Sequence, residues 1–127
     1  CYESVYGEYV TEYTRSGSKL FAIITNDGWW DVSEGHKQHL SYAKLRAIEN
    51  RRNIVRSANT GVSAIINYRG EIEDSIEYGE EGFINTNVGL IEEKTFYVNY
   101  GDYIFRISLF FFIIIGLHFL ATIVKIK

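Results

Sequence analysis

The chain has 127 residues, of which 46% are apolar and 23% carry a charge, a composition that excludes an intrinsically disordered chain. Its formal net charge is −3, and Arg51-Arg52 is its only conspicuous basic pair. Because nucleic-acid phosphates call for clustered Lys and Arg, we expect no nucleic-acid partner.

The chain begins with Cys1, which is its only cysteine, and it contains no Met. A lone thiol cannot form an internal disulfide, so Cys1 can be a catalytic nucleophile, a lipidated N-terminal cysteine or an inert apolar residue. Since ordinary initiation would leave a Met at the start, we expect the sequence to be a fragment of a longer protein.

The next hundred residues are predicted to form one domain, or part of one, in which helices and strands alternate. Leu40, Ala43, Ala47 and Ile48 recur at helical spacing and predict the buried face of one helix. The order strand, helix, strand, hairpin predicts a mixed sheet covered by helices, with the first half of the sheet missing. Helices are predicted over 5–14 and 36–52, and strands over 20–25, 54–58, 62–67, 71–76 and 83–90.

A long apolar segment follows this domain. Residues 107–124 carry no formal charge and would span about 27 Å as a helix, close to the thickness of a bilayer core. Adding Ile104 and Phe105, with Arg106 reaching to the interface, gives a comfortable length. The alternative, a buried core helix, is usually shorter. We therefore predict a transmembrane helix over 104–124.

The charges that flank this segment predict its orientation. Lys125 and Lys127 follow the span at once, and the positive-inside tendency places the tail of residues 125–127 in the cytoplasm. Residues 1–103 would then be extracytoplasmic. Tyr97, Tyr100 and Tyr103 would suit the headgroup zone, which amphipathic rings prefer.

Five motifs in one order resemble the C-terminal part of the apolipoprotein N-acyltransferases, membrane-anchored members of the nitrilase superfamily. The resemblance covers nearly the whole chain and implies an α/β fold, the C-terminal half of a nitrilase-like α-β-β-α sandwich followed by one transmembrane helix. It departs from the family pattern at Asp31-Val32-Ser33, where a Gly is expected directly after the tryptophans. The motifs are Cys1-Tyr2-Glu3, Asn26-Asp27-Gly28-Trp29-Trp30, Gly35-His36-Lys37-Gln38-His39-Leu40, Arg46-Ala47-Ile48-Glu49-Asn50 and Arg56-Ser57-Ala58-Asn59-Thr60-Gly61.

The resemblance implies a Glu-Lys-Cys acyltransferase in which Cys1 is the nucleophile. The backbone N–H of Tyr2 would help to bind the oxyanion, and Glu3 would be a supporting carboxylate, although a solvated first-turn carboxylate is the alternative for Glu3. A helix beginning near Val5 would place the thiol close to a positive helix end, which favours the thiolate. The Glu base and the Lys are expected upstream of residue 1, so the chain alone should be inactive.

The implied reaction takes an acyl chain from a phospholipid, holds it as a thioester on Cys1 and passes it to an apolipoprotein. The acceptor would be the α-amino group of an N-terminal diacylglyceryl-cysteine, and no cofactor is expected. Because both substrates are lipids, the partners include the membrane, and the location would be the periplasmic side of a bacterial inner membrane. Trp29 and Trp30 are candidates for acyl-chain contact, with core or rim packing as the alternative.

The resemblance assigns a supporting role to polar residues around the predicted helix 36–52. Asn26, Glu49, Asn50 and Asn59 are expected to be structural, with Glu49 and Asn50 holding the helix-to-strand connection against the Asn59 turn. From spacing alone, Arg46 and Glu49 would instead form a surface pair.

Other polar residues raise hypotheses of metal or membrane function. His36 and His39 would share a helix face, but zinc needs three or four ligands and none is evident nearby, so we expect no metal. His118, inside the apolar span, is expected to be neutral and bonded to a neighbouring helix. The acidic stretch 71–81 lacks the spacing of a calcium loop and fits a solvated hairpin.

Two other functions remain open from the sequence. A mature lipoprotein would be lipidated at Cys1 itself and would be a binding module, but such chains usually continue with a flexible polar tether. An amide or nitrile hydrolase would use the same triad on a soluble substrate, which gives the apolar span no role.

Overall fold

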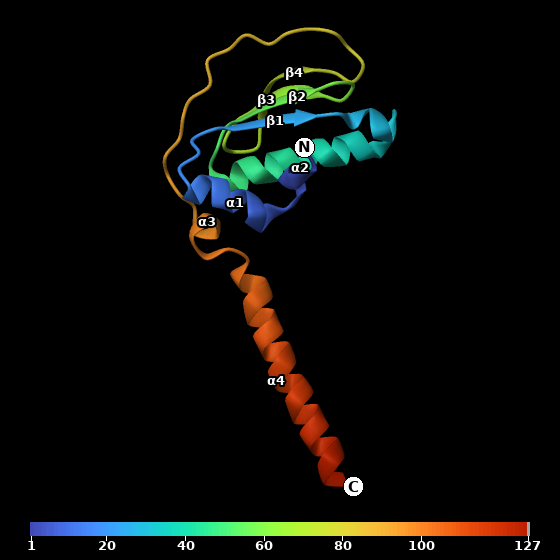
Figure 1. Ribbon diagram of the computed structural model, residues 1–127, viewed down its shortest axis with the longest axis vertical. Coiled ribbons are helices and arrows are strands. Elements are labelled where there is room, and N and C mark those ends of the chain that lie inside the picture. The colour runs from blue at the N-terminus through green and yellow to red at the C-terminus, as the bar shows by residue number, and fades with distance from the viewer. Residues whose placement is uncertain (127) are drawn as a thin grey trace.

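The computed structural model describes the backbone of residues 1–126 and the side chains as far as Ile123; Lys127, part of the predicted tail, lies outside the described residues. A four-stranded sheet has α1 and α2 together on one side, and α4 leads away from this domain (Figure 1). The elements are η1 (Tyr2–Val5), α1 (Gly7–Arg15), β1 (Phe21–Thr25), η2 (Asp27–Trp30), α2 (Glu34–Asn50), β2 (Ile54–Ala58), β3 (Ser63–Ile66), β4 (Ile72–Ile76), α3 (Phe96–Tyr100) and α4 (Tyr103–Ile126).

The strands lie in chain order, β1-β2-β3-β4. β1 and β2 are parallel, with Thr25 opposite Ala58, and α2 forms the crossover that a parallel pair needs. β2, β3 and β4 are antiparallel neighbours. The mixed α/β sheet predicted from the sequence is therefore confirmed, and β1 is an edge strand of the described sheet.

The core lies between α2 and the sheet. Ala43 and Ala47 are fully buried there, and their small side chains let the helix approach the strands closely. Burial of each large apolar side chain stabilises the fold by about 1.5–3 kcal/mol. The buried cluster consists of Ile23, Ala43, Ala47, Ile54, Val62, Ala64 and Ile66.

α2 begins two residues earlier than predicted, because Ser33 caps it by accepting a hydrogen bond from the Gly35 N–H. The prediction that Ile48 lies on the buried face is wrong, since its side chain is 49% exposed. The buried face of α2 includes polar side chains, which the spacing of apolar residues could not predict. These buried polar residues are His36, His39, Arg46 and Asn50.

The strand predicted over 83–90 is wrong. This segment is irregular, and its apolar side chains have no core beneath them, as the exposed fractions of 89% for Phe83 and 64% for Leu90 show. It runs back from β4 toward α3 and is attached through the backbone carbonyl of Gly89, which accepts from Asn53. The sequence reasoning also missed α3, whose first turn Thr95 caps.

The predicted apolar helix is present as α4, and its residues Tyr103–Ile123 are long and apolar enough to cross a membrane. Within residues 1–126 no other helix meets these criteria. At its start, Arg106 forms an ion pair with Glu8 of α1 and donates to the carbonyl of Tyr100 at 3.0 Å. His118 is exposed on the side of α4.

Candidate active site around Cys1

Cys1 lies beside the C-terminal end of β1. Its Sγ atom is 2.8 Å from the hydroxyl Oγ1 of Thr25, and its carbonyl accepts a hydrogen bond from the Ser4 hydroxyl at 2.9 Å. The residue is exposed as a whole. The chain continues directly into the short turn η1, and α1 begins only at Gly7, so the predicted helix from residue 5 starts later than expected.

The end of β1 is fixed by its parallel neighbour. The N–H of Asn59, just beyond β2, donates to the carbonyl of Thr25 at 3.0 Å and extends the strand pairing by one bond. Thr25 is buried, with only 5% of its surface exposed. The two strand ends therefore hold Thr25 rigidly next to the thiol.

Behind Thr25 lies a buried polar network around Asp27. The Thr25 hydroxyl donates to Asp27 Oδ1 at 2.9 Å, and Nδ1 of His39 lies 2.9 Å from the same oxygen. Nη2 of Arg56 donates to Asp27 Oδ2 at 2.5 Å. Asp27 has no exposed surface, and His39 and Arg56 are almost as deeply buried. Cys1 is thus the solvent-facing end of a chain of polar contacts.

The electrostatics of this network favour an ionised carboxylate. Burial by itself would raise the pKa of Asp27, but hydrogen bonds from Arg56, His39 and Thr25, with the positive charge of Arg56, lower it below its ordinary value. A carboxylate only accepts hydrogen bonds, so the Nδ1 of His39 carries the proton that it shares with Asp27.

The backbone leaves little room around Asp27. A Cβ atom on Gly61, in the turn after β2, would overlap the carboxylate of Asp27. On the other side, a Cβ on Gly28 would come within 2.8 Å of the Thr60 hydroxyl. The glycines at positions 28 and 61 are therefore explained by the close approach of two loops near Asp27.

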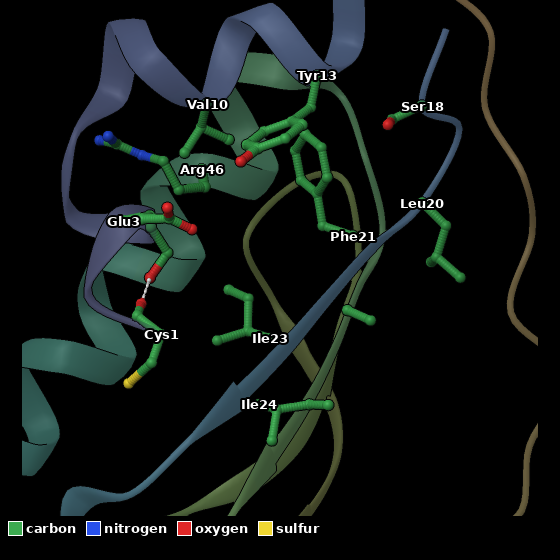
Figure 2. Close-up of a pocket in the computed structure, with 12 residues that line it drawn as sticks. Cys1, Glu3, Val10, Tyr13, Ser18, Leu20, Phe21, Ile23, Ile24 and Arg46 are labelled. Carbon is green, nitrogen blue, oxygen red and sulfur yellow. Dashed lines mark hydrogen bonds between the residues drawn. The ribbon is translucent and has the colours of Figure 1, made fainter. Parts of the chain in front are cut away.

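Cys1 and Glu3 line one end of a pocket of about 290 Å³ that follows β1 toward α1. Figure 2 shows the Glu3 carboxylate and the Cys1 sulfur on opposite sides of their turn, with Val10, Tyr13 and Ile23 along the rest of the pocket. Both residues thus line the pocket, but the thiol of Cys1 and the carboxylate of Glu3 point in different directions. The side chain of Tyr2 lies near α2, where the centroid of its ring is 6.4 Å from that of His39.

The two tryptophans have different surroundings. Trp29 is 84% exposed. Trp30 packs on α2, where its ring centroid lies 5.1 Å from that of His39 and its atoms occupy the space that a Cβ on Gly35 would need. Packing therefore accounts for Trp30. The Trp29 side chain, in contrast, is left largely uncovered by the described residues.

The expected supporting residues fall into two groups. Asn26 caps η2 by accepting from the Gly28 N–H at 3.2 Å, and Asn59 holds the end of β1. Glu49 and Asn50 were expected to hold the helix-to-strand connection against the Asn59 turn, but their side chains bind other partners. Asn50 accepts from the Thr14 hydroxyl at 2.9 Å and so joins α2 to α1.

Glu49 forms an ion pair with Arg46 at 3.0 Å, and burial raises the pKa of Glu49 although Arg46 opposes this. Arg46 is only 5% exposed and also donates to the carbonyl of Val5. The pair is therefore not the simple surface pair that spacing suggested, because Arg46 connects α2 to the turn after Cys1.

The two histidines of α2 do not act as a pair. His39 binds Asp27, whereas the ring of His36 packs against Tyr78 with a centroid distance of 4.7 Å. Across the described part of the chain, no group of three His, Cys, Asp or Glu side chains is placed to hold a metal ion.

Sequence reasoning did not identify Thr25, Asp27, His39 and Arg56 as one network. A signal was present at Arg56, since it shares the inward face of an apolar strand with Ile54. A buried Arg requires a partner with negative charge, and Asp27 lies two residues after the neighbouring apolar strand. That reasoning would have predicted the ion pair, but not its link to Cys1 through Thr25.

The chain is similar to known proteins over most of its length. The chain is 42% identical over 102 residues to an apolipoprotein N-acyltransferase of Geobacter metallireducens, covering 80% of the chain and 20% of that protein. The corresponding values are 40% over 103 residues, 80% and 19% for Bradyrhizobium diazoefficiens, and 32% over 108 residues, 85% and 22% for Thermotoga maritima. The chain thus spans about a fifth of the length of these curated relatives. The model of the carbon-nitrogen hydrolase family matches residues 1–92, from Cys1 through the whole sheet and the Asp27 network, and the chain belongs to this family.

Proposed function

We propose that this chain is the nucleophile-bearing part of an apolipoprotein N-acyltransferase. The observation that carries the proposal is the thiol of the exposed residue Cys1 at the end of a buried polar network, in a carbon-nitrogen hydrolase domain that continues into a membrane-length apolar helix. The similarity to proteins named apolipoprotein N-acyltransferase supports the choice of reaction.

In the proposed first step, a base removes the proton of Cys1, and the sulfur attacks the ester carbonyl of a phospholipid. The ester C–O bond breaks, a lysophospholipid leaves with the proton, and a thioester remains. The amine of the apolipoprotein then attacks this thioester, an amide forms, and the thiol is restored. The backbone N–H of Tyr2 would stabilise the oxyanion of each step. Glu3 would stabilise the site electrostatically as a supporting carboxylate.

The base and the lysine of the proposed Glu-Lys-Cys set are expected upstream of residue 1, so we propose that the chain is inactive by itself. The exposed Trp29 is proposed to contact an acyl chain. The α4 helix would hold the site at the surface of a bilayer, where both lipid substrates are present, with residues 1–103 on the periplasmic side of the inner membrane.

The other two functions fit the site less well. A lipidated N-terminal cysteine needs a flexible tether, whereas Cys1 is held against Thr25 and leads directly into η1. A hydrolase of soluble amides gives no reason for a helix with the length and composition of α4.

The proposal predicts an acyl adduct on Cys1. The full-length gene product that contains this chain should gain the mass of one acyl group when it is incubated with phospholipid vesicles, as measured by intact-mass spectrometry. Cys1→Ala should show no adduct, because the nucleophile is absent, and Ser16→Ala, an exposed hydroxyl change at the end of α1, should behave like the wild type.

An adduct that persists in Cys1→Ala would refute the nucleophile role. A wild-type protein that remains unmodified, with no transfer to a diacylglyceryl-cysteine peptide, would refute the acyltransferase itself.

A further inference from the structure

We propose that Thr25 is a positioning residue for the Cys1 thiol and that Asp27 fixes the direction of its hydroxyl. The inference rests on the proposed function for its catalytic consequence, but it is argued from the contacts of the two residues. The contacts in question are the 2.8 Å approach of Sγ to Thr25 and the 2.9 Å bond from Thr25 to Asp27.

A threonine hydroxyl has one proton to donate. Asp27 is an ionised carboxylate that can only accept, so the proton of Thr25 points toward Oδ1. The side of Thr25 that faces Cys1 then offers a lone pair and no proton. The contact between the two side chains is therefore donated by the thiol, in the order Cys1 S–H to Thr25 to Asp27.

This order is rigid because Asp27 cannot move. Arg56 holds one of its oxygens, His39 holds the other, and Gly61 leaves no space for a shift of the carboxylate. Thr25 is held in turn by the pairing of β1 with β2 and by the N–H of Asn59. A buried scaffold of this kind fixes the geometry of the group that it contacts.

The consequence concerns the nucleophile. An exposed cysteine side chain would otherwise exchange among three staggered rotamers. The contact with Thr25 selects one of them and directs the thiol proton inward. Small displacements of a reacting atom lower the rate strongly, so loss of this contact should slow acyl transfer without removing any reacting group.

The test compares Thr25→Val, which keeps the shape and removes the hydroxyl, with Thr25→Ser, which keeps the hydroxyl. Thr14→Val is the matched control, because Thr14 is also buried and its hydroxyl donates to Asn50 instead of contacting the thiol. Acyl-enzyme formation in the full-length gene product is measured from phospholipid vesicles. Alkylation of Cys1 by iodoacetamide is measured separately by peptide mass spectrometry.

Thr25→Val should form the acyl enzyme about tenfold to a hundredfold more slowly than the wild type. It should also be alkylated about threefold to tenfold faster at one fixed pH, because its thiol is no longer held against Thr25 by a hydrogen bond. Thr25→Ser should restore both rates, and Thr14→Val should change neither by as much as twofold.

Alkylation of Thr25→Val at the wild-type rate, or a Thr25→Ser variant that behaves like Thr25→Val, would overturn the inference. If the wild type forms no acyl enzyme, the proposed function fails, while the alkylation rates still decide the role of Thr25. A folding defect is distinguished by circular dichroism and by the recovery in Thr25→Ser.

Discussion

Asp27 has no exposed surface and lies between Arg56 and His39. Its charge is therefore stabilised by hydrogen bonds inside the protein and not by water. Removing one partner of a buried ion pair typically costs about 3–5 kcal/mol, because the remaining charge is left without compensation. In Asp27→Asn the guanidinium of Arg56 would lose its anionic partner. The contribution of the Asp27 charge to stability can therefore be measured separately from its hydrogen bond with Thr25.

The lowered pKa of Asp27 predicts how this stabilisation depends on pH. The pKa in the folded state lies below the ordinary value of 3.8, so the stabilising effect is fully present above that value. It is lost as the pH falls through the folded-state pKa. The free energy of unfolding of the wild type should exceed that of Asp27→Asn by about 3–5 kcal/mol at neutral pH.

This difference should stay constant down to about pH 4 and become smaller below it. Denaturant unfolding of the full-length gene product at a series of pH values, followed by circular dichroism, provides the measurement. A difference that already shrinks between pH 7 and pH 5 would show that Asp27 is not the group responsible.

At the scale of elements, Arg52 connects the parts of the chain that surround the sheet. It is 1% exposed, and its guanidinium donates to the carbonyls of Ser18 at 2.7 Å, Arg51 at 2.9 Å and Glu93 at 2.6 Å. The segment before β1, the end of α2 and the return segment before α3 are thus joined by one side chain. Its planar fork of donors suits this task better than a single ammonium group.

Arg52→Lys should therefore destabilise the protein by about 2–4 kcal/mol although the charge is kept. The matched control is Arg69→Lys on the exposed turn between β3 and β4, which should stay within about 0.5 kcal/mol of the wild type. Thermal unfolding of the full-length gene product measures both. Equal melting temperatures for the two variants would contradict the proposed role of Arg52.

The same elements show what the sequence could predict. Hydrophobic runs and the turn at Gly70 were sufficient for the central strands, and the uncharged segment was sufficient for α4, because burial and length leave a local pattern. The 83–90 strand failed because apolar alternation does not reveal whether a core lies beneath it. The exposure of Phe83 shows that none does.

The site was predictable to a similar degree. The motifs predicted roles for Cys1 and Glu3, which stay predictions, and both residues line one pocket. The Thr25–Asp27 contact depends on the register of β1 against β2 and on which loops meet at Gly61. These are long-range features that no local pattern encodes. The same limit explains why Asn50 was expected near the Asn59 turn, whereas its side chain binds Thr14.

At the scale of the whole molecule, the domain and α4 meet through α1 and α3. Arg15 of α1 donates to the carbonyl of Val98 in α3 at 2.6 Å, and Arg106 of α4 pairs with Glu8. Exposed pairs such as Arg106–Glu8 contribute at most about 1 kcal/mol, so the pair orients α4 more than it stabilises the protein. The rings of Phe96, Tyr100 and Tyr103 cluster at this junction, where an aromatic belt would meet lipid headgroups.

This arrangement predicts the topology of the protein. A helix satisfies its own backbone hydrogen bonds, and the span of Tyr103–Ile123 is about 32 Å at 1.5 Å per residue, enough to cross a bilayer core. Lys125 and Lys127 in the sequence favour a cytoplasmic C-terminal side. The exposed Glu81, in the segment between β4 and α3, should then face the periplasm.

Cysteine labelling tests this topology in a full-length gene product whose native cysteines, including Cys1, are replaced by Ser. In intact spheroplasts a membrane-impermeant maleimide should label Glu81→Cys, whereas Lys127→Cys should be labelled only after lysis, because the bilayer separates the two positions. Labelling of Lys127→Cys before lysis, with Glu81→Cys protected, would reverse the orientation. Labelling of both positions in intact spheroplasts that keep a cytoplasmic marker protected would show that α4 does not span the membrane.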